Sequence, residues 1–332
     1  MVTIKEVAKR ANTSIATVSR VINNSSYVKE ETRQRVLQAI KELNYQPLTR
    51  QLAGRENQFI GLVVPDVSNP FFGKMARGLA DAAGKFGYSI TLCNIDGICR
   101  GEDDYLLDLI ENRVDGVIYA SSHRIREVIK RAKQKKIPLV MLDREIKYTD
   151  INTVTIDNNY GAFLATEHLI SLGHKKIAFI GGPKNFQISE QRRIGYEKAL
   201  EKYGLSYDEE LVYTGIFTME SGFKAVKQLL EDKKSFSALI AANDLMAIGA
   251  INCLNQHGIS VPDDVSVVGF DDISIASTME PKLTTIAYPI ERISERSLEL
   301  LMKQISNEDV CPEKITLFPK LIVRGSTKSL KE

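Results

Sequence analysis

Side chains suited to binding a small polyhydroxylated molecule recur along the larger, C-terminal part of the chain. Arginine and carboxylate groups hydrogen-bond neighbouring hydroxyls in pairs, and aromatic rings can cover the apolar face of a sugar ring. These residues follow short apolar runs or lie between them, and ligands of open α/β sheets bind beyond the carboxyl ends of the strands. The candidates are Asp66, Asn69, Phe71, Phe72, Asp143, Arg144, Arg192, Phe217, Asn243, Asp244, Phe270, Asp271 and Asp272.

Each candidate also has an ordinary structural role open to it. The two arginines and Asp271 could form ion pairs at the surface or between subdomains. One of Phe71 and Phe72 is expected in the core, because adjacent helical residues face different ways. Asn243 could cap a helix that begins at Asp244. The residue types alone leave these alternatives open.

The elements at the N-terminus are expected to be short helices. Residues 3–6, with the sequence TIKE, have the pattern of a capping box that begins the first helix. Ser14 can cap a second helix, in which Val18, Val21 and Ile22 share one face at helical spacing. The residues left largely outside that face are Ile15, Ala16, Ser19 and Arg20.

A third helix is expected over residues 30–44, after a turn cluster at residues 23–26. Its inward residues are expected to be Val36, Leu37, Ile40 and Leu43. Two short helices joined by a tight turn, followed by a third that braces them, form the helix-turn-helix plan.

The remainder of the chain, from residue 59, alternates short β-rich apolar runs with amphipathic helical segments such as residues 71–87 and 105–113. This alternation favours parallel sheets with helices on both faces. The strands are too numerous for one small sheet, so two doubly wound sheets joined by a hinge are expected. The apolar runs are FIGLVVP, SITLCNI, DGVIYAS, PLVMLDR, TVTID, KIAFIGG, SALIAAN and VSVVGFD.

Charge is unevenly distributed along the chain. The net charge is only +2, but residues 1–57 hold ten basic and five acidic side chains, whereas the remainder holds 34 basic and 37 acidic ones. A small basic module on a slightly acidic body suggests a polyanionic partner for the N-terminus. A solvated charged face is the alternative that charge alone allows.

Several classes of protein are disfavoured by what the sequence lacks. The four cysteines have no metal-ligand spacing, so reduced thiols, no metal and no cofactor are expected. The four histidines lie singly, and no GxSxG, GxxxxGK[ST] or HExxH pattern occurs, which disfavours an enzyme. The N-terminus has no signal-peptide core, and no run approaches the ~18 apolar residues of a membrane span. A cytoplasmic protein is therefore expected, rather than a sugar-binding transport protein without a regulatory role, which is the alternative function.

The segment TIKEVAKRANTSIATVSRVINNSSYVKEETRQRVLQAIKELNYQP resembles the DNA-binding domain of the lac-repressor (LacI/GalR) family. The blocks ATVSRVIN, TRQRV and ELNYQP carry the resemblance, which is more specific than a bare helix-turn-helix pattern. It implies a bacterial transcription regulator whose second helix enters the major groove of operator DNA. One departure is Lys29, where the family usually has a small capping serine.

The resemblance also implies which residues contact DNA. The positions that match the family's base readers are Ile15, Ala16 and Arg20. Arg20 can form two hydrogen bonds with guanine O6 and N7, worth ~1–3 kcal/mol of discrimination, although a phosphate contact is its alternative role. Ile15 and Ala16 have no polar side-chain atoms and can read only thymine methyls and shape. The residues placed to meet phosphates, which position the protein, are Thr3, Ser14, Thr17, Ser19 and Asn23.

The linker over residues 48–58 resembles the family's hinge helix, which orders on operator DNA. Leu52, with Ala53, matches the leucine that wedges into the minor groove. The stretch between Pro47 and Leu52 is two residues shorter than usual, which corresponds to ~200° of helix rotation if the loss falls inside the helix. If the loss falls before the helix, only the tether shortens.

Residues 59–332 resemble the effector-binding and dimerisation domain of the same family, which is similar to periplasmic sugar-binding proteins. With a head over residues 1–47, this implies two doubly wound subdomains with crossing connections. The first is expected at about 59–157 plus 288–306, and the second at about 158–287 plus 307–326.

The pocket motifs of the family match the strand-end segments described above. The effector-binding residues implied are Asn69, Phe71, Phe72, Arg144, Arg192, Phe217, Asn243, Phe270 and Asp271. Such a set resembles a ribose-type pocket, but Tyr288 stands where those pockets usually offer an amide. A pentose, a hexose and a sugar phosphate all remain open as effectors.

The mechanism that the resemblance implies is that of a homodimeric repressor. A symmetric dimer would bind a pseudo-palindrome with half-sites ~10 bp apart. Effector binding would close the two subdomains and change the spacing of the two heads. A coupling free energy of ~1–3 kcal/mol would suffice for regulation.

Overall fold

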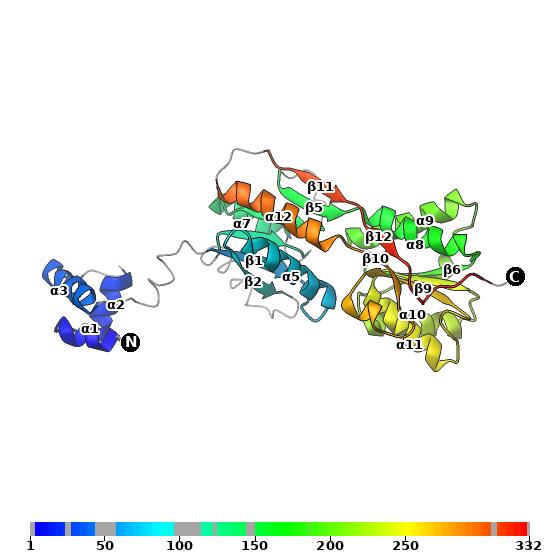
Figure 1. Ribbon diagram of the computed structural model, residues 1–332, viewed down its shortest axis with the longest axis horizontal. Coiled ribbons are helices and arrows are strands. Elements are labelled where there is room, and N and C mark those ends of the chain that lie inside the picture. Colours follow the sequence, from blue (N-terminus) through cyan, green and yellow to red (C-terminus); the bar gives the residue numbers. More distant parts are fainter. Residues whose placement is uncertain are drawn as a thin grey trace. The chain divides into compact units, whose positions relative to one another are not determined.

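The computed structural model describes residues 4–23, 28–43, 58–95, 114–121, 125–143, 150–184, 186–306 and 311–330. The chain divides into two compact units, Met1–Gln58 and Phe59–Glu332 (Figure 1). The two units, called the head and the body below, are each described by themselves. Within the described ranges, no helix has both the length and the apolar character that crossing a membrane requires.

The head contains three helices around one apolar cluster. They are α1 (Ile4–Arg10), α2 (Ile15–Asn23) and α3 (Glu30–Glu42). The Oγ atom of Ser14 accepts a hydrogen bond of 3.1 Å from the backbone N–H of Thr17, so Ser14 caps α2 as predicted. The cluster consists of Val7, Ala8, Ala11, Val18, Val21, Val36 and Ala39. The helix-turn-helix plan is thus confirmed.

Helix α3 differs from the prediction in one inward residue. Leu37 is 39% exposed, whereas Val36 is fully buried and Ala39 is 2% exposed. Successive helical residues are about 100° apart, so Leu37 is turned away from the face that Val36 shares with Ala39. Lys29 forms no side-chain capping hydrogen bond, so α3 begins without the cap that a serine there could provide.

The first sheet of the body is wholly parallel, with the strand order β11-β5-β4-β3-β1-β2. Its central strands are continuous apolar runs, as expected for strands covered on both faces. The strands are β1 (Phe59–Val64), β2 (Ser89–Asn94), β3 (Gly116–Tyr119), β4 (Leu139–Leu142), β5 (Asn152–Ile156) and β11 (Lys314–Leu317). Helices α5 (Pro70–Gly84), α7 (Ile125–Lys135) and α12 (Ile290–Ile305) accompany this sheet. The helix predicted over residues 105–113 lies outside the described residues.

The second sheet has the order β12-β10-β9-β8-β6-β7, in which only β12 is antiparallel to its neighbour. The strands are β6 (Ile177–Gly181), β7 (Val212–Thr214), β8 (Ala238–Ala241), β9 (Ser266–Asp271), β10 (Thr284–Ala287) and β12 (Lys320–Ile322). The helices are α8 (Asn158–Ser171), α9 (Gln187–Lys202), α10 (Met219–Glu231) and α11 (Asp244–Gln256), with short 3₁₀ turns η1 (Glu209–Leu211) and η2 (Ser274–Ser277). Two doubly wound parallel sheets are therefore confirmed.

The chain crosses between the sheets after β5, after β10 and between β11 and β12. The last crossing corrects one predicted boundary, because residues 307–326 were assigned wholly to the second subdomain. Instead, β11 pairs in parallel with β5 in the first sheet, with Ile315 opposite Val154. The backbone N–H of Asp157 donates to Leu317 O at 2.9 Å, so β11 occupies the free edge of β5. Only β12 belongs to the second sheet.

Two histidines link the C-terminal segment to the second sheet through hydrogen bonds. His174, which is 3% exposed, places Nδ1 2.9 Å from Ser237 Oγ and Nε2 3.1 Å from Lys328 O. His168 Nε2 lies 3.0 Å from Thr327 Oγ1. Burial lowers the pKa of both imidazoles, and for His168 the nearby His174 lowers it further. Both rings therefore lose a proton more readily than an exposed imidazole does.

Acidification is expected to destabilise the body through this histidine pair. Because the folded-state pKa values are lowered, the unfolded chain binds more protons, and stability falls as the pH drops below the ordinary histidine pKa of 6.5. Thermal unfolding followed between pH 8 and pH 5 isolates this loss as the difference between the wild type and a histidine variant, because the raised pKa values of Asp244 and Asp271 act with the opposite sign. The variant H168Q should show a smaller loss, whereas H257Q, at an exposed histidine, should match the wild type. Equal pH dependence in all three proteins would contradict the assignment.

Candidate functional sites

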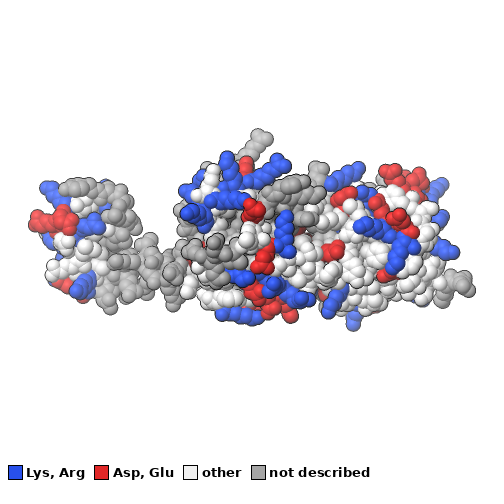
Figure 2. All heavy atoms as spheres, turned by 90° about the horizontal axis from the view of Figure 1, so that it is seen from above, with Lys and Arg blue, Asp and Glu red and all other residues white. Residues whose placement is uncertain are grey.

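The exposed face of α2 carries the three side chains predicted to read bases. Ile15 is 44% exposed, and Ala16 and Arg20 are also exposed, while Val18 and Val21 are buried beneath them. The three exposed side chains lie within about 140° of one another around the helix axis. One surface of a duplex could therefore meet all three. Figure 2 shows basic and acidic side chains mixed over the described surface of the head.

The residues predicted to contact phosphates differ in the interactions that their side chains already make within the head. The hydroxyls of Ser14 and Thr17 lie 2.9 Å apart and bond to each other beside the start of α2. Ser19 is half-buried and already has an interaction within the head. The predicted DNA-contacting residues that lie outside the described set are Thr3, Leu52, Ala53 and the side chain of Asn23.

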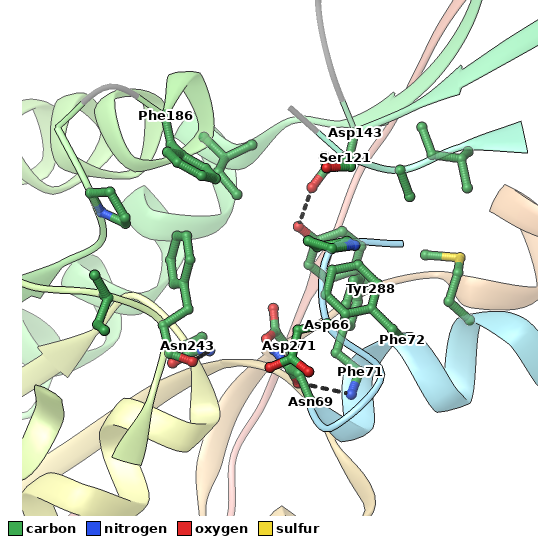
Figure 3. Close-up of a pocket in the computed structure, with 18 of the residues that line it drawn as sticks. Asp66, Asn69, Phe71, Phe72, Ser121, Asp143, Phe186, Asn243, Asp271 and Tyr288 are labelled. Atoms are coloured by element: carbon green, nitrogen blue, oxygen red, sulfur yellow. Dashed lines mark hydrogen bonds between the residues drawn. The ribbon is translucent and has the colours of Figure 1, made fainter. Parts of the chain in front are cut away.

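A cavity of about 800 Å³ lies between the two sheets of the body, at the carboxyl ends of their parallel strands (Figure 3). Its volume is within the range of ~300–1,000 Å³ that small-molecule sites usually have. We call this cavity the cleft. It is lined by Pro65, Asp66, Asn69, Phe71, Phe72, Met75, Ala120, Ser121, Leu142, Asp143, Pro183, Phe186, Ile188, Arg192, Ile216, Phe217, Thr218, Asn243, Asp271 and Tyr288.

Two asparagines of the cleft also cap helices. Asn69 Oδ1 accepts from the backbone N–H of Phe71 at 3.0 Å and begins α5. Asn243 Oδ1 accepts from the backbone N–H of Met246 at 2.9 Å and begins α11. The capping role considered for Asn243 is therefore real, and it leaves the amide nitrogen near the cleft, 3.4 Å from Phe217 O. Capping fixes the orientation of each amide before any ligand arrives.

Arg192, from α9, is a buried lining residue of the cleft, and three of its five N–H donors have partners within the protein. Its Nε donates to Asn158 Oδ1 at 2.9 Å, its Nη1 to Ala242 O, and its Nη2 to the hydroxyl of Tyr288 at 2.6 Å. The guanidinium lies 3.7 Å above the centre of the Phe270 ring, and Arg192 is only 2% exposed. The desolvated charge is thus compensated by hydrogen bonds and by an aromatic face.

Tyr288 connects this arginine to the first sheet. Its hydroxyl accepts from Arg192 and donates to Asp143 Oδ2 at 2.8 Å (Figure 3). The other oxygen of Asp143 accepts from Asn158 Nδ2 at 3.1 Å and from Thr155 Oγ1 at 3.2 Å. Burial raises the pKa of Tyr288 well above its usual range, so the phenol keeps its proton. Residues of both subdomains therefore meet in one hydrogen-bonded group.

Asp271 lies at the end of β9 with its carboxyl group directed to the cleft (Figure 3). Burial raises its pKa well above the usual range, although Arg192, with Nη2 3.9 Å from Oδ1, opposes the rise. Its backbone φ is +114°, and φ is also positive at Asp143 (+51°) and Asp272 (+56°). Such conformations are unfavourable for side-chain-bearing residues and concentrate at functional sites.

Aromatic rings cover two walls of the cleft. On one wall, Phe71 packs edge-on against Phe72 and Tyr288, with ring centres 5.2 and 4.8 Å apart. Phe71 is 7% exposed, so it is the member of the adjacent pair that belongs mainly to the core. On the opposite wall, Phe186 and Phe217 pack edge-on at 6.2 Å. A flat ligand with apolar faces would fit between these walls.

The structure brings most of the predicted effector-binding residues together. Those that line the cleft are Asn69, Phe71, Phe72, Arg192, Phe217, Asn243 and Asp271. Phe270 is 1% exposed and supports Arg192 from below instead of lining the cleft. Arg144 lies outside the described residues.

Other residues at the cleft were not among the predicted binding residues. Asn158, which is 1% exposed, joins Arg192 to Asp143, and Tyr288 completes the same group. Phe186 follows β6, so the rule of strand carboxyl ends could have found it. The partnership of Tyr288 with Asp143, 145 positions apart, had no local signal.

Asp244, a candidate beside Asn243, proves to be a buried structural carboxyl group of the second sheet. It accepts from Thr285 Oγ1 at 2.5 Å and from the backbone N–H of Ile273 at 2.8 Å. Burial raises its pKa to about 7, against the opposing effect of these two hydrogen bonds. Asp244 therefore holds the segment that directly follows Asp271, the last residue of β9, against β10.

Comparison with known proteins identifies the relatives of both units. Residues 3–47 match the sequence profile of the bacterial regulatory proteins of the lacI family, and residues 166–327 match that of a periplasmic binding protein-like domain. A ribose operon repressor of Halalkalibacterium halodurans is 39% identical over 330 residues, which cover 99% of this chain and 98% of that protein.

Solved structures agree with this relationship over nearly the whole chain. A complex of the transcriptional regulator CelR with cellobiose has a TM-score of 0.75 and 34% identity, covering 98% of this chain and 100% of that one. A lac repressor dimer bound to operator and the anti-inducer ONPF has a TM-score of 0.74 and 29% identity, covering 98% and 99%. The match of the head separates the chain from transport-type sugar-binding proteins and from enzymes. The chain belongs to the lacI family of bacterial regulatory proteins, which are DNA-binding transcription regulators.

Proposed function

We propose that this chain is a homodimeric transcription repressor that acts in the cytoplasm and responds to a small sugar-like effector bound in the cleft. The observation that carries the proposal is the joint presence of two sites in one chain. One is the exposed face of α2 in a head that matches the lacI family. The other is a cleft of about 800 Å³ whose walls combine carboxyl, amide and aromatic groups.

At the operator, each head reads one half of a pseudo-palindrome. Arg20 forms two hydrogen bonds with a guanine, while Ile15 and Ala16 contact thymine methyls in the major groove. The support is the exposure of these three residues on one face of α2. Leu52 and Ala53 are proposed to act at the central minor groove, as in the hinge helix that residues 48–58 resemble.

In the cleft, the effector's hydroxyls bond to Asp271, Asn69 and Asn243, and its apolar face lies against Phe72 and Phe217. Arg144, next to Asp143 in the sequence, is proposed as a further ligand. The support is that the helix caps and the positive φ of Asp271 fix these polar groups in place. A pre-organised site loses less conformational entropy when a ligand binds.

Effector binding is coupled to the head through the relative position of the two subdomains. Asp271 faces the cleft, and its neighbour Asp272 accepts a hydrogen bond through its backbone oxygen from Lys74 Nζ of α5, at 2.8 Å. Asp272 also pairs with Arg324 at 2.6 Å. A ligand that moves Asp271 therefore acts on a contact between the second subdomain and the first, which carries the connection to the head.

Selection of operator DNA with the purified full-length chain tests the proposal. We expect recovery of a pseudo-palindrome whose half-site centres are ~10 bp apart. Binding of the selected duplex, measured by fluorescence anisotropy, should change ~5–150-fold when one sugar of a panel is added. A scrambled duplex of equal length serves as the control. Binding without sequence preference, or a response to none of the sugars, would contradict the corresponding half of the proposal.

Sedimentation of the free protein and of its complex tests the dimer. A species of twice the chain mass of 37.1 kDa is expected, because a two-fold symmetric site is matched by a two-fold symmetric protein. A complex that contains one chain per operator would contradict it.

A further inference from the structure

The floor of the cleft holds a buried cation, Arg192, each of whose three nitrogens already donates a hydrogen bond within the protein. Arg192 donates through all three of its nitrogens, to Asn158, to the backbone at Ala242 and to Tyr288. Its side chain is 3% exposed and lies flat over Phe270. Three of its five N–H donors are used in this way, and the side chain that carries the other two is 3% exposed, so an anionic group of a ligand has little access to the guanidinium.

The partner nearest to the cleft is the hydroxyl of Tyr288. Its ring lies 4.8 Å from that of Phe71 and 5.9 Å from that of Phe270, and the residue is 6% exposed. The same hydroxyl donates to Asp143 at 2.8 Å. The hydroxyl of Tyr288 is therefore bonded to both Arg192 and Asp143. It occupies the position between arginine and carboxylate that a ligand hydroxyl could otherwise take (Figure 3).

The charges that remain at the cleft oppose an anionic ligand. Among the described lining residues, Arg192 is the sole cation, whereas Asp66, Asp143 and Asp271 contribute three carboxyl groups. Burial already raises the pKa of Asp271, and a further negative charge nearby would make its ionised form still less favourable. Hydroxyl groups, in contrast, can donate to these carboxylates.

We propose that Tyr288 is a specificity-determining residue: by holding Arg192, it makes the cleft select an uncharged polyhydroxylated ligand and reject the phosphate ester of the same sugar. This inference rests on the proposed function of the cleft as an effector site. It narrows the effector class from pentoses, hexoses and sugar phosphates to the neutral members.

Isothermal titration of the full-length protein tests the proposal with D-ribose, D-glucose and D-fructose and with the terminal phosphate monoester of each. The wild type is expected to bind a neutral sugar at least ~100-fold more tightly than its phosphate ester, because like charges brought together in a desolvated site repel strongly. Y288F keeps the aromatic ring but removes the hydroxyl that accepts a hydrogen bond from Nη2 of Arg192. In that variant the preference for the neutral sugar over its phosphate ester should fall about tenfold or more. The reason is that Nη2 of Arg192, no longer bonded to the Tyr288 hydroxyl, can donate to the phosphate.

Matched controls separate specificity from general damage. Y203F removes an exposed phenol hydroxyl that donates to Glu167, outside the cleft, and should leave the preference unchanged. Y288L provides a second test if Y288F unfolds, because leucine has no polar atom that could accept a hydrogen bond from Arg192. The ratio of the two dissociation constants is the readout, since a loss of stability alone would weaken both ligands together.

The outcomes distinguish this inference from the proposed function beneath it. Tighter binding of a phosphate ester by the wild type, for instance through Arg144, would overturn the inference but support a sugar-type effector site. An unchanged preference in both Y288F and Y288L would overturn the role of Tyr288. Binding of no compound from either set would reject the sugar-type site itself, and this inference with it.

Discussion

Replacing Arg20 with alanine is expected to relax the base preference at one position of each operator half-site while the other positions stay as selective as before. Arg20 lies exposed on α2, beside Ile15 and Ala16. Two hydrogen bonds to guanine O6 and N7 are worth ~1–3 kcal/mol, so discrimination at that position should fall ~5–150-fold. Anisotropy titrations against operators that carry each of the four base pairs at every position measure the effect.

A matched variant controls for the lost charge. R35A removes an equal charge from an exposed position on α3. It should change the salt dependence of binding at most, and the base preferences should stay as in the wild type. If R20A instead weakened binding to all sequences equally and reduced the salt slope by about one, Arg20 would be a phosphate contact.

The variant D271N is expected to lose the response to the effector while still binding the operator. Asp271 lines the cleft at the end of β9, and an amide of equal size cannot offer two negatively charged acceptors to ligand hydroxyls. Each hydrogen bond to a charged group contributes ~1.5–3 kcal/mol, so effector affinity should fall ~10–150-fold for each bond lost. Titration of the effector, with and without operator, measures both properties in one protein.

The stability of D271N is expected to remain close to that of the wild type. Asparagine tolerates the positive φ of +114° nearly as well as aspartate does. Burial raises the pKa of Asp271, which means that a neutral group at this position meets less of a desolvation penalty than a carboxylate. D81N, at an exposed carboxylate of α5, is the control for effector affinity. A normal effector response in D271N would exclude Asp271 from the binding site.

Together these two variants separate reading DNA from sensing a metabolite. R20A changes a residue of the head and should leave effector affinity unchanged. D271N changes a residue of the body and should leave base preference unchanged. The coupling between the sites is a difference in free energy between two arrangements of the body, so it can be lost without loss of either binding site.

Most helices and strands of this protein, and the general position of its two sites, could be predicted from local sequence patterns. Helical spacing in the head placed Val18 and Val21 inside and left Ile15 and Arg20 exposed, as the structure has them. Apolar runs predicted the central strands, and the rule of strand carboxyl ends placed Asn69 and Asp271 at the cleft. These are local properties, because the period of a helix or strand is read from adjacent residues.

Features that depend on residues far apart in the chain could not be predicted from local patterns and became visible in the fold. The strand β11 has too few apolar residues to predict its partner, and its place beside β5 follows from a free sheet edge. The prediction that Leu37 faces inward was wrong because the buried face of α3 is set by the parts of it that α1 and α2 cover.

The hydroxyl of Tyr288 is hydrogen-bonded to both Arg192 and Asp143, and these three residues come from segments that no local pattern relates. Whether a buried charge faces a ligand or is neutralised internally depends on which partners the fold brings within hydrogen-bonding distance. The sequence therefore established that the chain has a DNA-binding head and an effector site. The fold decided which chemical groups that site leaves free.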